Sequence, residues 1–160
     1  MTRDDLANTF SGIGVELGVA AGDYSETILN NDSVRLLYSI DRWSDHHDER
    51  EYQKAKQRLA KYGERSQIIR SSFEDVVDEI DNGFFDFVFI DAYAHTGQCN
   101  GRWLREWWPK LKRGGIFAGH DYDPQYQQTI EAVDEFAALN CLNITITDEQ
   151  YLPSWFCVKP

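Results

Sequence analysis

The sequence predicts a doubly wound α/β fold: a mostly parallel sheet of seven strands, helices on both faces, and an antiparallel hairpin closing one edge. Short apolar runs alternate with longer polar stretches of helical spacing, which is the pattern of strand–helix–strand units. The run FDFVFI at 85–90 is continuously apolar, as expected for a strand buried on both faces. The 160 residues are enough for one domain, 1–160, with a core that needs no staples.

The first half of the chain is expected to hold three strand–helix units. Strands are predicted at 13–18, 34–41 and 67–72, and shorter helices at 24–32 and 73–80. Ser44 or Asp45 is expected to cap a long polar helix that runs through Tyr62. Apolar residues lie at helical spacing along that segment: Tyr52, Ala55, Leu59 and Tyr62.

The second half is expected to complete the sheet. A strand at 85–91 precedes a helix over GRWLREWWPKLK, which Pro109 kinks or ends and whose Trp103, Trp107 and Trp108 pack onto the sheet. A turn at Gly114-Gly115 leads into a fifth strand and its exit loop at 116–122, and a helix follows at about 126–139. Two closing strands near 142–147 and 154–159 have no helix between them, so they are expected to be antiparallel.

Composition excludes several classes of partner. The chain has 27 acidic and 16 basic residues and a formal charge of −11, which repels phosphate backbones and anionic lipid surfaces. We therefore expect no nucleic-acid and no membrane partner. No signal-type segment opens the chain, and the three cysteines Cys99, Cys141 and Cys157 lack metal-ligand spacing, so we expect reduced thiols in a cytoplasmic protein.

The stretch ELGVAAGDYS after the first strand points to a nucleoside ligand. Ligands of such sheets bind beyond the carboxyl ends of the strands. Gly18 permits a sharp turn and a close approach to the backbone, and Gly22 opens the following helix. Asp41 ends the second strand 23 residues beyond Gly18, where a carboxylate can bind both hydroxyls of a ribose. A tight turn without a ligand is the alternative explanation of the glycine pair.

The type of nucleoside cofactor follows from the glycine spacing. A dinucleotide site needs G-x-G-x-x-G, so that glycines lie against a pyrophosphate. Here Ala20 stands where the second glycine belongs, and Gly12 and Gly14 precede the strand instead of following it. A cofactor with a ribose and no phosphates fits better, and S-adenosylmethionine is the common one; an NAD-dependent reductase is disfavoured.

Four segments together, ELGVAAGDYS, YSID, FDFVFID and GGIFAGHDY, resemble class I S-adenosylmethionine-dependent methyltransferases. The likeness covers essentially the whole chain and is closest to the small-molecule branch that includes catechol and sugar O-methyltransferases. It implies a Rossmann-like sheet, S-adenosylmethionine as cofactor, and methyl transfer to a small-molecule acceptor, expected to be a hydroxyl.

The resemblance also implies positions for the cofactor. Glu16 and Gly18 would line its methionine end, with Tyr24 or Ser25 near its carboxylate. Asp41 would hold the ribose, Arg42 and Trp43 would flank the adenine, and Ser72 and Phe73 would lie at the adenine edge. Gly22 and Asp91 complete the expected cofactor-binding set.

In metal-dependent members of this family, acids ending the fourth and fifth strands hold magnesium. The matching residues here are Asp91, His120 and Asp121, and because His120 is an awkward ligand for a hard cation, manganese is the alternative. Two acids at adjacent strand ends repel one another unless a cation or a donor joins them. A lysine of the catechol-type relatives is replaced by Ala94, which leaves His95 and Asp121 as the expected catalytic residues.

Three further points complete the expectations from the sequence. His46-His47 between Asp45 and Asp48 is interpreted as a solvated helix start and not as a metal cluster. The first strand begins near residue 13, so a second copy of the chain in a homo-oligomer, or the acceptor itself, has to cover the site. The rival function is a non-catalytic cofactor-binding or interaction domain.

Overall fold

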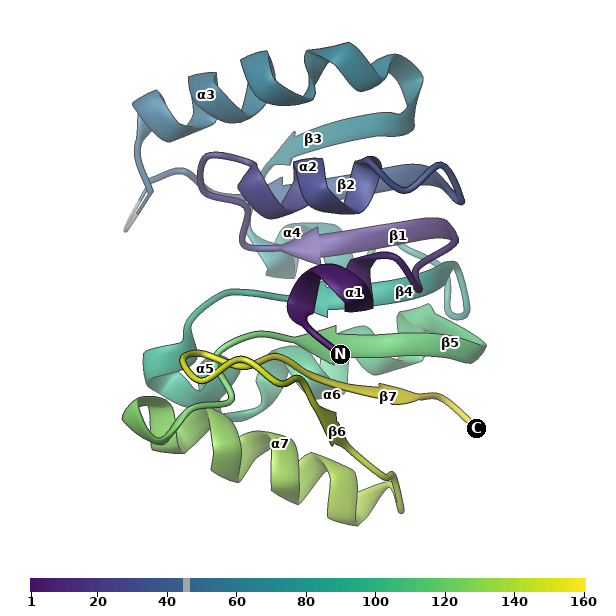
Figure 1. The fold of residues 1–160 in the computed structure, drawn as a ribbon, viewed down its shortest axis with the longest axis vertical. Coiled ribbons are helices and arrows are strands. Elements are labelled where there is room, and N and C mark those ends of the chain that lie inside the picture. Colours follow the sequence, from purple (N-terminus) through teal and green to yellow (C-terminus); the bar gives the residue numbers. More distant parts are fainter. Residues whose placement is uncertain (45–46) are drawn as a thin grey trace.

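The computed structural model describes residues 1–44 and 47–160 and contains the predicted doubly wound sheet. Seven strands lie in the order β3-β2-β1-β4-β5-β7-β6 (Figure 1). Strands β1 to β5 pair in parallel, and β7 runs antiparallel to both β5 and β6, which confirms the closing hairpin at one edge. The strands are β1 (Gly12–Leu17), β2 (Val34–Asp41), β3 (Ser66–Arg70), β4 (Phe85–Ile90), β5 (Leu111–Gly119), β6 (Thr145–Ile146) and β7 (Trp155–Val158).

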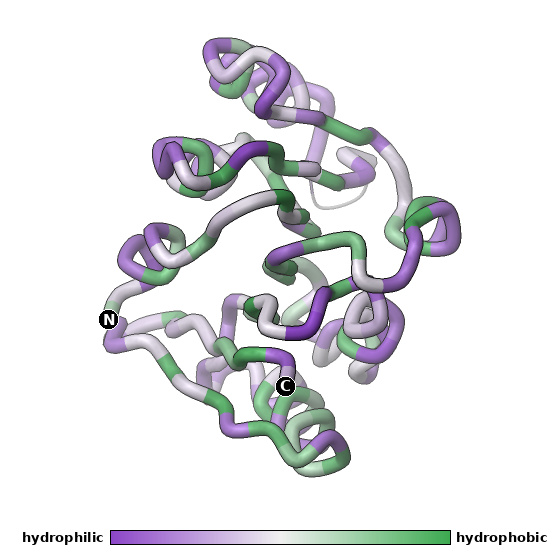
Figure 2. The backbone as a smooth tube through the Cα atoms, turned by 90° about the vertical axis from the view of Figure 1, so that its right-hand side faces the viewer, coloured by the Kyte–Doolittle hydropathy of each residue, from purple (hydrophilic) through white to green (hydrophobic). Residues whose placement is uncertain are grey.

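Helices cover both faces of the sheet, as the view turned by 90° shows (Figure 2). They are α1 (Arg3–Ala7), α2 (Asp23–Leu29), α3 (Glu49–Leu59), α4 (Phe73–Val77), α5 (Gly97–Asn100), α6 (Arg102–Trp107) and α7 (Gln127–Leu139). Short 3-10 turns are η1 (Ala60–Arg65), η2 (Ala94–Thr96), η3 (Trp108–Lys110) and η4 (Pro124–Tyr126). Within the described ranges, no helix has both the length and the apolar character needed to cross a bilayer.

The buried strand β4 explains the two-sided core. Successive side chains of a strand point to opposite faces, so Phe87 and Phe89 pack against α1 and α2, while Val88 and Ile90 pack against α4, α6 and α7. The prediction that tryptophans pack onto the sheet is confirmed on the face covered by α4, α6 and α7. Trp103 and Trp107 are buried there, and the α-helix ends at Trp107 just before Pro109.

The long helix starts later than predicted. Asp48 caps α3 by accepting hydrogen bonds from the backbone N–H groups of Arg50 (2.8 Å) and Glu51 (3.1 Å), and Glu51 completes a capping box. Ser44 is therefore not the cap, and Asp45, the other expected cap, lies outside the described residues together with His46. The α-helix ends at Leu59 and continues as the 3-10 turn η1, which contains Tyr62.

Strand β5 starts earlier than predicted, at Leu111, and contains both Gly114 and Gly115. A Cβ on Gly115 would lie 2.7 Å from the carbonyl oxygen of Asp86 on β4, and Gly114 has a φ of +77°. The pair therefore forms an irregularity within the strand, where β5 approaches β4 closely, instead of a turn before it.

The N-terminal helix α1 was not predicted. Thr2 and Asp5 form a capping box at its start, and Leu6 and Ala7 are fully buried. Just beyond the helix, the ring of Phe10 stacks on Phe87 of β4 with centroids 4.3 Å apart. These contacts hold the first residues of the chain against the sheet beside β1 and β4 (Figure 1).

Candidate functional site

Two adjoining cavities lie at the carboxyl ends of the parallel strands. The first, of about 360 Å³, is lined by Arg3, Asp4, Glu16, Gly18, Val19, Ala20, Asp23, Tyr24, Thr27, His47 and Asp91. The second, of about 240 Å³, is lined by Gly18, Asp41, Arg42, His47, Phe73, Asp91, Ala92, Tyr93, Ala94, His95, Asp121 and Tyr126. They share Gly18, His47 and Asp91, so the two cavities adjoin one another at these residues.

The glycines of the turn after β1 have separate physical roles. Gly18 has a φ of +89°, and a Cβ there would lie 2.0 Å from the carbonyl oxygen of Asp91. Only glycine therefore allows β1 and β4 to end so close together between the two cavities. Gly22 has a φ of +80° and is the N-cap of α2, where a Cβ would lie 3.2 Å from the Cα of Ala55. It packs against α3 and lines neither cavity.

Asp41 organises this turn through its carboxylate. Its Oδ2 accepts hydrogen bonds from the N–H groups of Val19 (2.9 Å) and Ala20 (3.1 Å), and lies 2.8 Å from Nδ1 of His47. Its Oδ1 accepts from the N–H of Trp43 at 2.9 Å. Burial opposes the charged form, but these hydrogen bonds outweigh it and hold the pKa of Asp41 below its ordinary value.

Glu16 forms the floor of the first cavity as a buried acid. Its side chain accepts a hydrogen bond from Ser25, whose Oγ also lies 3.1 Å from Oγ of Ser39. Burial raises the pKa of Glu16 to about 8, so at neutral pH this carboxyl is mostly protonated. Ser25 is fully buried behind Glu16 and lines neither cavity.

Aromatic residues form one wall of the second cavity. The ring of Phe73 meets Tyr93 edge-on, with centroids 6.1 Å apart, and both line this cavity. Ser72 accepts a hydrogen bond from the N–H of Asp75 at 3.2 Å as the cap of α4, outside the lining. Trp43 is buried and donates its indole N–H to the carbonyl of Ala20 at 2.8 Å, so it supports the turn from behind.

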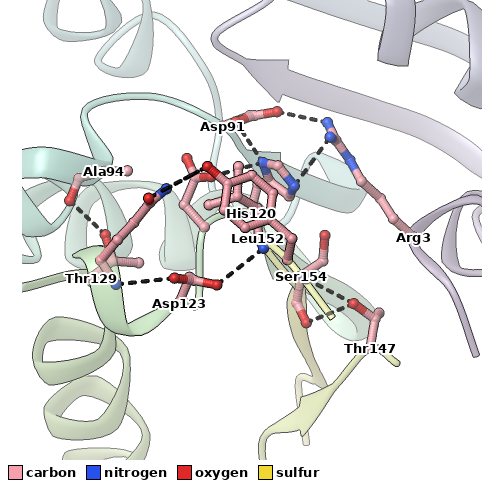
Figure 3. Close-up of polar contacts among 12 residues, drawn as sticks. Arg3, Asp91, Ala94, His120, Asp123, Thr129, Thr147, Leu152 and Ser154 are labelled. Carbon is pink, nitrogen blue, oxygen red and sulfur yellow. Dashed lines mark hydrogen bonds and ion pairs between the residues drawn. The ribbon is translucent and has the colours of Figure 1, made fainter. Parts of the chain in front are cut away.

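His120 bridges the expected acid pair, and Arg3 binds one of the two acids, Asp91 (Figure 3). Nδ1 of His120 lies 3.1 Å from Asp121 Oδ1 and 3.4 Å from Asp91 Oδ1. Arg3 donates from Nη2 to Asp91 Oδ2 at 2.7 Å, and its Nη1 lies 3.3 Å from Nε2 of His120. Arg3 thus brings the N-terminal helix into the site.

These neighbours set the charges of the cluster. Burial lowers the pKa of His120, but hydrogen bonds with Asp121 and Asp91 outweigh it and raise the pKa to about 9. Burial likewise opposes the charged form of Asp91, and hydrogen bonds from His120 and Arg3 still hold its pKa below the ordinary value. The repulsion between the two acids is therefore already relieved by the chain's own side chains.

The same cluster was the expected metal site. One ligand atom each of Asp91, His120 and Asp121 can be chosen so that all lie within 4.8 Å of one another. However, Arg3 is bound to Asp91 and the His120 ring bridges both acids, so a divalent cation would have to displace one positive charge and compete with a second. As arranged, these residues do not fit a dedicated magnesium or manganese site.

Several lining residues were missed in the sequence. Arg3 is the most consequential, and the T-x-x-D spacing of Thr2 and Asp5 was the signal that could have predicted its helix. His95, an expected catalytic residue, lies on η2 with an exposed side chain at the second cavity. Asp121, the other expected catalytic residue, also lines this cavity, whereas His120 lines neither.

Comparison with known proteins identifies the family. Residues 13–122 match a family model described as a methyltransferase domain, which spans the strands that carry both cavities. No curated protein matches the chain.

Three solved structures show how widely the fold is used. An O-methyltransferase from Bacillus cereus in complex with SAH is 19% identical (TM-score 0.71; 98% of this chain and 78% of that chain covered). The cofactor-bound protein Rv0187 from MTB is 13% identical (TM-score 0.76; 97% and 76%). A spermidine synthase from Thermotoga maritima is 16% identical (TM-score 0.73; 99% and 58%). At these identities the likeness shows the fold alone.

Proposed function

Because this chain belongs to the methyltransferase family, as a class I S-adenosylmethionine-dependent domain, we propose that it methylates a hydroxyl group of a small-molecule acceptor. The observation that carries the proposal is the pair of adjoining cavities around Gly18. Asp41 and Phe73 offer a carboxylate and an aromatic wall for an adenosine in the second cavity. Glu16 and Asp91 offer polar groups for a methionine end in the first.

The bound cofactor would supply an activated methyl group, which transfers in a single in-line displacement. This chain's residues would then align the acceptor and remove its proton. His95 and Asp121 both line the second cavity beside Tyr126. We assign His95 the role of base, since histidine most often serves in that role, and Asp121 the role of accepting a hydrogen bond from the acceptor hydroxyl.

A divalent metal has no step in this proposal. The cluster of Asp91, His120 and Asp121 already contains the Arg3 guanidinium, which neutralises Asp91. His120 then serves to hold Asp121 in position through its Nδ1 contact of 3.1 Å.

Charge supports a small acceptor over a nucleic acid. The chain carries a formal charge of −11, and Asp4, Asp23 and Asp91 line the first cavity, which disfavours polyphosphate ligands. Helix α1 closes part of the site, and we propose that the acceptor or a second copy of the chain covers the rest.

The test is methyl transfer from labelled S-adenosylmethionine to a panel of small phenols, catechols and sugar hydroxyls, with magnesium and with EDTA. The proposal expects label in at least one acceptor, retained in EDTA and strongly reduced in His95→Gln. Label transferred only with added magnesium would contradict the metal-free assignment. Tight cofactor binding without transfer to any hydroxyl would instead favour a cofactor-binding domain.

A further inference from the structure

We infer that Arg3 and Asp91 form a receptor for the α-amino acid end of the cofactor, with Arg3 binding its carboxylate and Asp91 its ammonium group. This inference rests on the proposed function and assigns a binding role to the N-terminal helix. It makes Arg3 a residue that selects cofactors carrying a carboxylate.

The guanidinium of Arg3 is held in place from several sides. Its central carbon lies 3.9 Å from the centroid of the Tyr24 ring, and Tyr24 donates its hydroxyl to the Arg3 carbonyl at 3.1 Å. The backbone N–H of Arg3 donates to Glu149. The side chain is 23% exposed, so the guanidinium is fixed yet accessible from the cavity.

The charged residues that line the first cavity offer one basic partner to an incoming carboxylate. Arg3 is the one lysine or arginine among the described residues that line it, whereas Asp4, Asp23 and Asp91 carry the opposite sign. A ligand carboxylate there would be repelled by these three acids and attracted by Arg3. An ammonium group finds the complementary partner in Asp91, which adjoins Gly18 in both cavities.

The resting Arg3–Asp91 pair is complementary to an amino-acid zwitterion. Nη2 of Arg3 and Oδ2 of Asp91 lie 2.7 Å apart. A ligand with neighbouring ammonium and carboxylate groups can replace this ion pair by two new ones, its carboxylate with Arg3 and its ammonium with Asp91, without changing the net charge of the site. The Nε of Arg3 is a buried donor without a partner in the described part of the chain. A planar guanidinium with an unmet donor is suited to bind a carboxylate with two parallel hydrogen bonds.

The experiment is calorimetric titration with two ligands that share the adenosine and differ in the amino acid. S-adenosylhomocysteine carries the ammonium and carboxylate, and methylthioadenosine carries neither. Arg3→Met should weaken S-adenosylhomocysteine binding about tenfold to a hundredfold and change methylthioadenosine binding less than about threefold. Arg3→Lys, which keeps the charge without the planar fork, should fall between. Arg35→Met, an exposed arginine of β2, is the control for the change in net charge.

The outcomes separate the two proposals. If Arg3→Met binds S-adenosylhomocysteine as tightly as the wild type, the receptor role of Arg3 is wrong. Equal losses for both ligands would show that Arg3 only supports the fold of the site, and would also overturn the inference. If the wild type binds neither ligand, the proposed function itself fails, and this inference with it.

Discussion

Replacing Asp41 tests whether one carboxylate organises the turn between the two cavities. The Asp41 oxygens accept from three backbone N–H groups, those of Val19, Ala20 and Trp43, and one lies 2.8 Å from His47. Asp41→Ala leaves those three donors without their acceptor. Each unsatisfied buried donor costs about 1–3 kcal/mol, and water from the adjoining cavity offsets part of that, so we expect a total loss of about 3–5 kcal/mol.

Asp41→Asn separates charge and geometry from size. The asparagine amide must point its NH₂ group either at the Val19 and Ala20 donors or at the Trp43 donor, so it cannot restore the wild-type contacts. We expect a loss of about 2–4 kcal/mol, close to that of the alanine variant.

The assay is urea unfolding followed by circular dichroism, with Asp81→Asn, an exposed acid before β4, as the control. Because the pKa of Asp41 is lowered in the fold, its contribution is present above the ordinary carboxyl pKa and is lost as the pH falls through the lower folded value. The gap between wild type and Asp41→Asn should therefore shrink in acid. An Asp41→Asn protein as stable as the control would refute the reasoning.

Further predictions concern the glycine turn, the buried acid Glu16 and the cluster that was the expected metal site. Gly18→Ala should lower the free energy of unfolding by about 2–4 kcal/mol in the same urea assay, because its Cβ would lie 2.0 Å from the Asp91 carbonyl oxygen. The control is Gly83→Ala, where φ is +67° and the space around the new Cβ is open, and it should cost about 1–2 kcal/mol. Equal losses of stability in the two variants would show that the positive φ, and not the contact with the Asp91 carbonyl, causes the destabilisation. Glu16→Gln should remove a stability loss that the wild type shows as the pH rises from about 5 to 8, because the folded pKa of Glu16 is raised to about 8. That loss is at most about 4 kcal/mol, and parallel pH curves for the two proteins would contradict this. Titration with Mn²⁺, followed by its electron paramagnetic resonance signal, should show no tight site in the wild type, and micromolar binding would restore the metal hypothesis for Asp91 and Asp121.

Much of the fold could be predicted because the strands follow simple patterning. β2 spans 34–41, as predicted, and the apolar run of β4 gave a strand that ended within one residue of its prediction. Strand and helix boundaries that depend on tertiary contacts were harder to predict from the sequence. β5 extends back to Leu111, which pairs with Phe85 of β4, and the Asp48 capping box starts the long helix at Glu49.

The residues that line the second cavity could be predicted where they follow strand ends. Asp41, Phe73, Asp91 and Asp121 all line the second cavity, because parallel strands bring their carboxyl ends to one edge. Arg3 could not be predicted in this way. Its five-residue helix is too short to be stable by itself and forms through packing of Leu6 and Ala7 against the sheet. The role of Gly18 also depends on a neighbouring strand, since the β4 backbone occupies the space of its missing side chain.

The most direct measurement of the central claim is calorimetric titration of the wild-type protein with S-adenosylhomocysteine and, separately, with NADH. The two cavities around Gly18, with Ala20 at the position where a dinucleotide site needs glycine, predict saturable one-to-one binding of S-adenosylhomocysteine and no binding of NADH. Binding of NADH, or no heat with S-adenosylhomocysteine at millimolar concentration, would contradict the account.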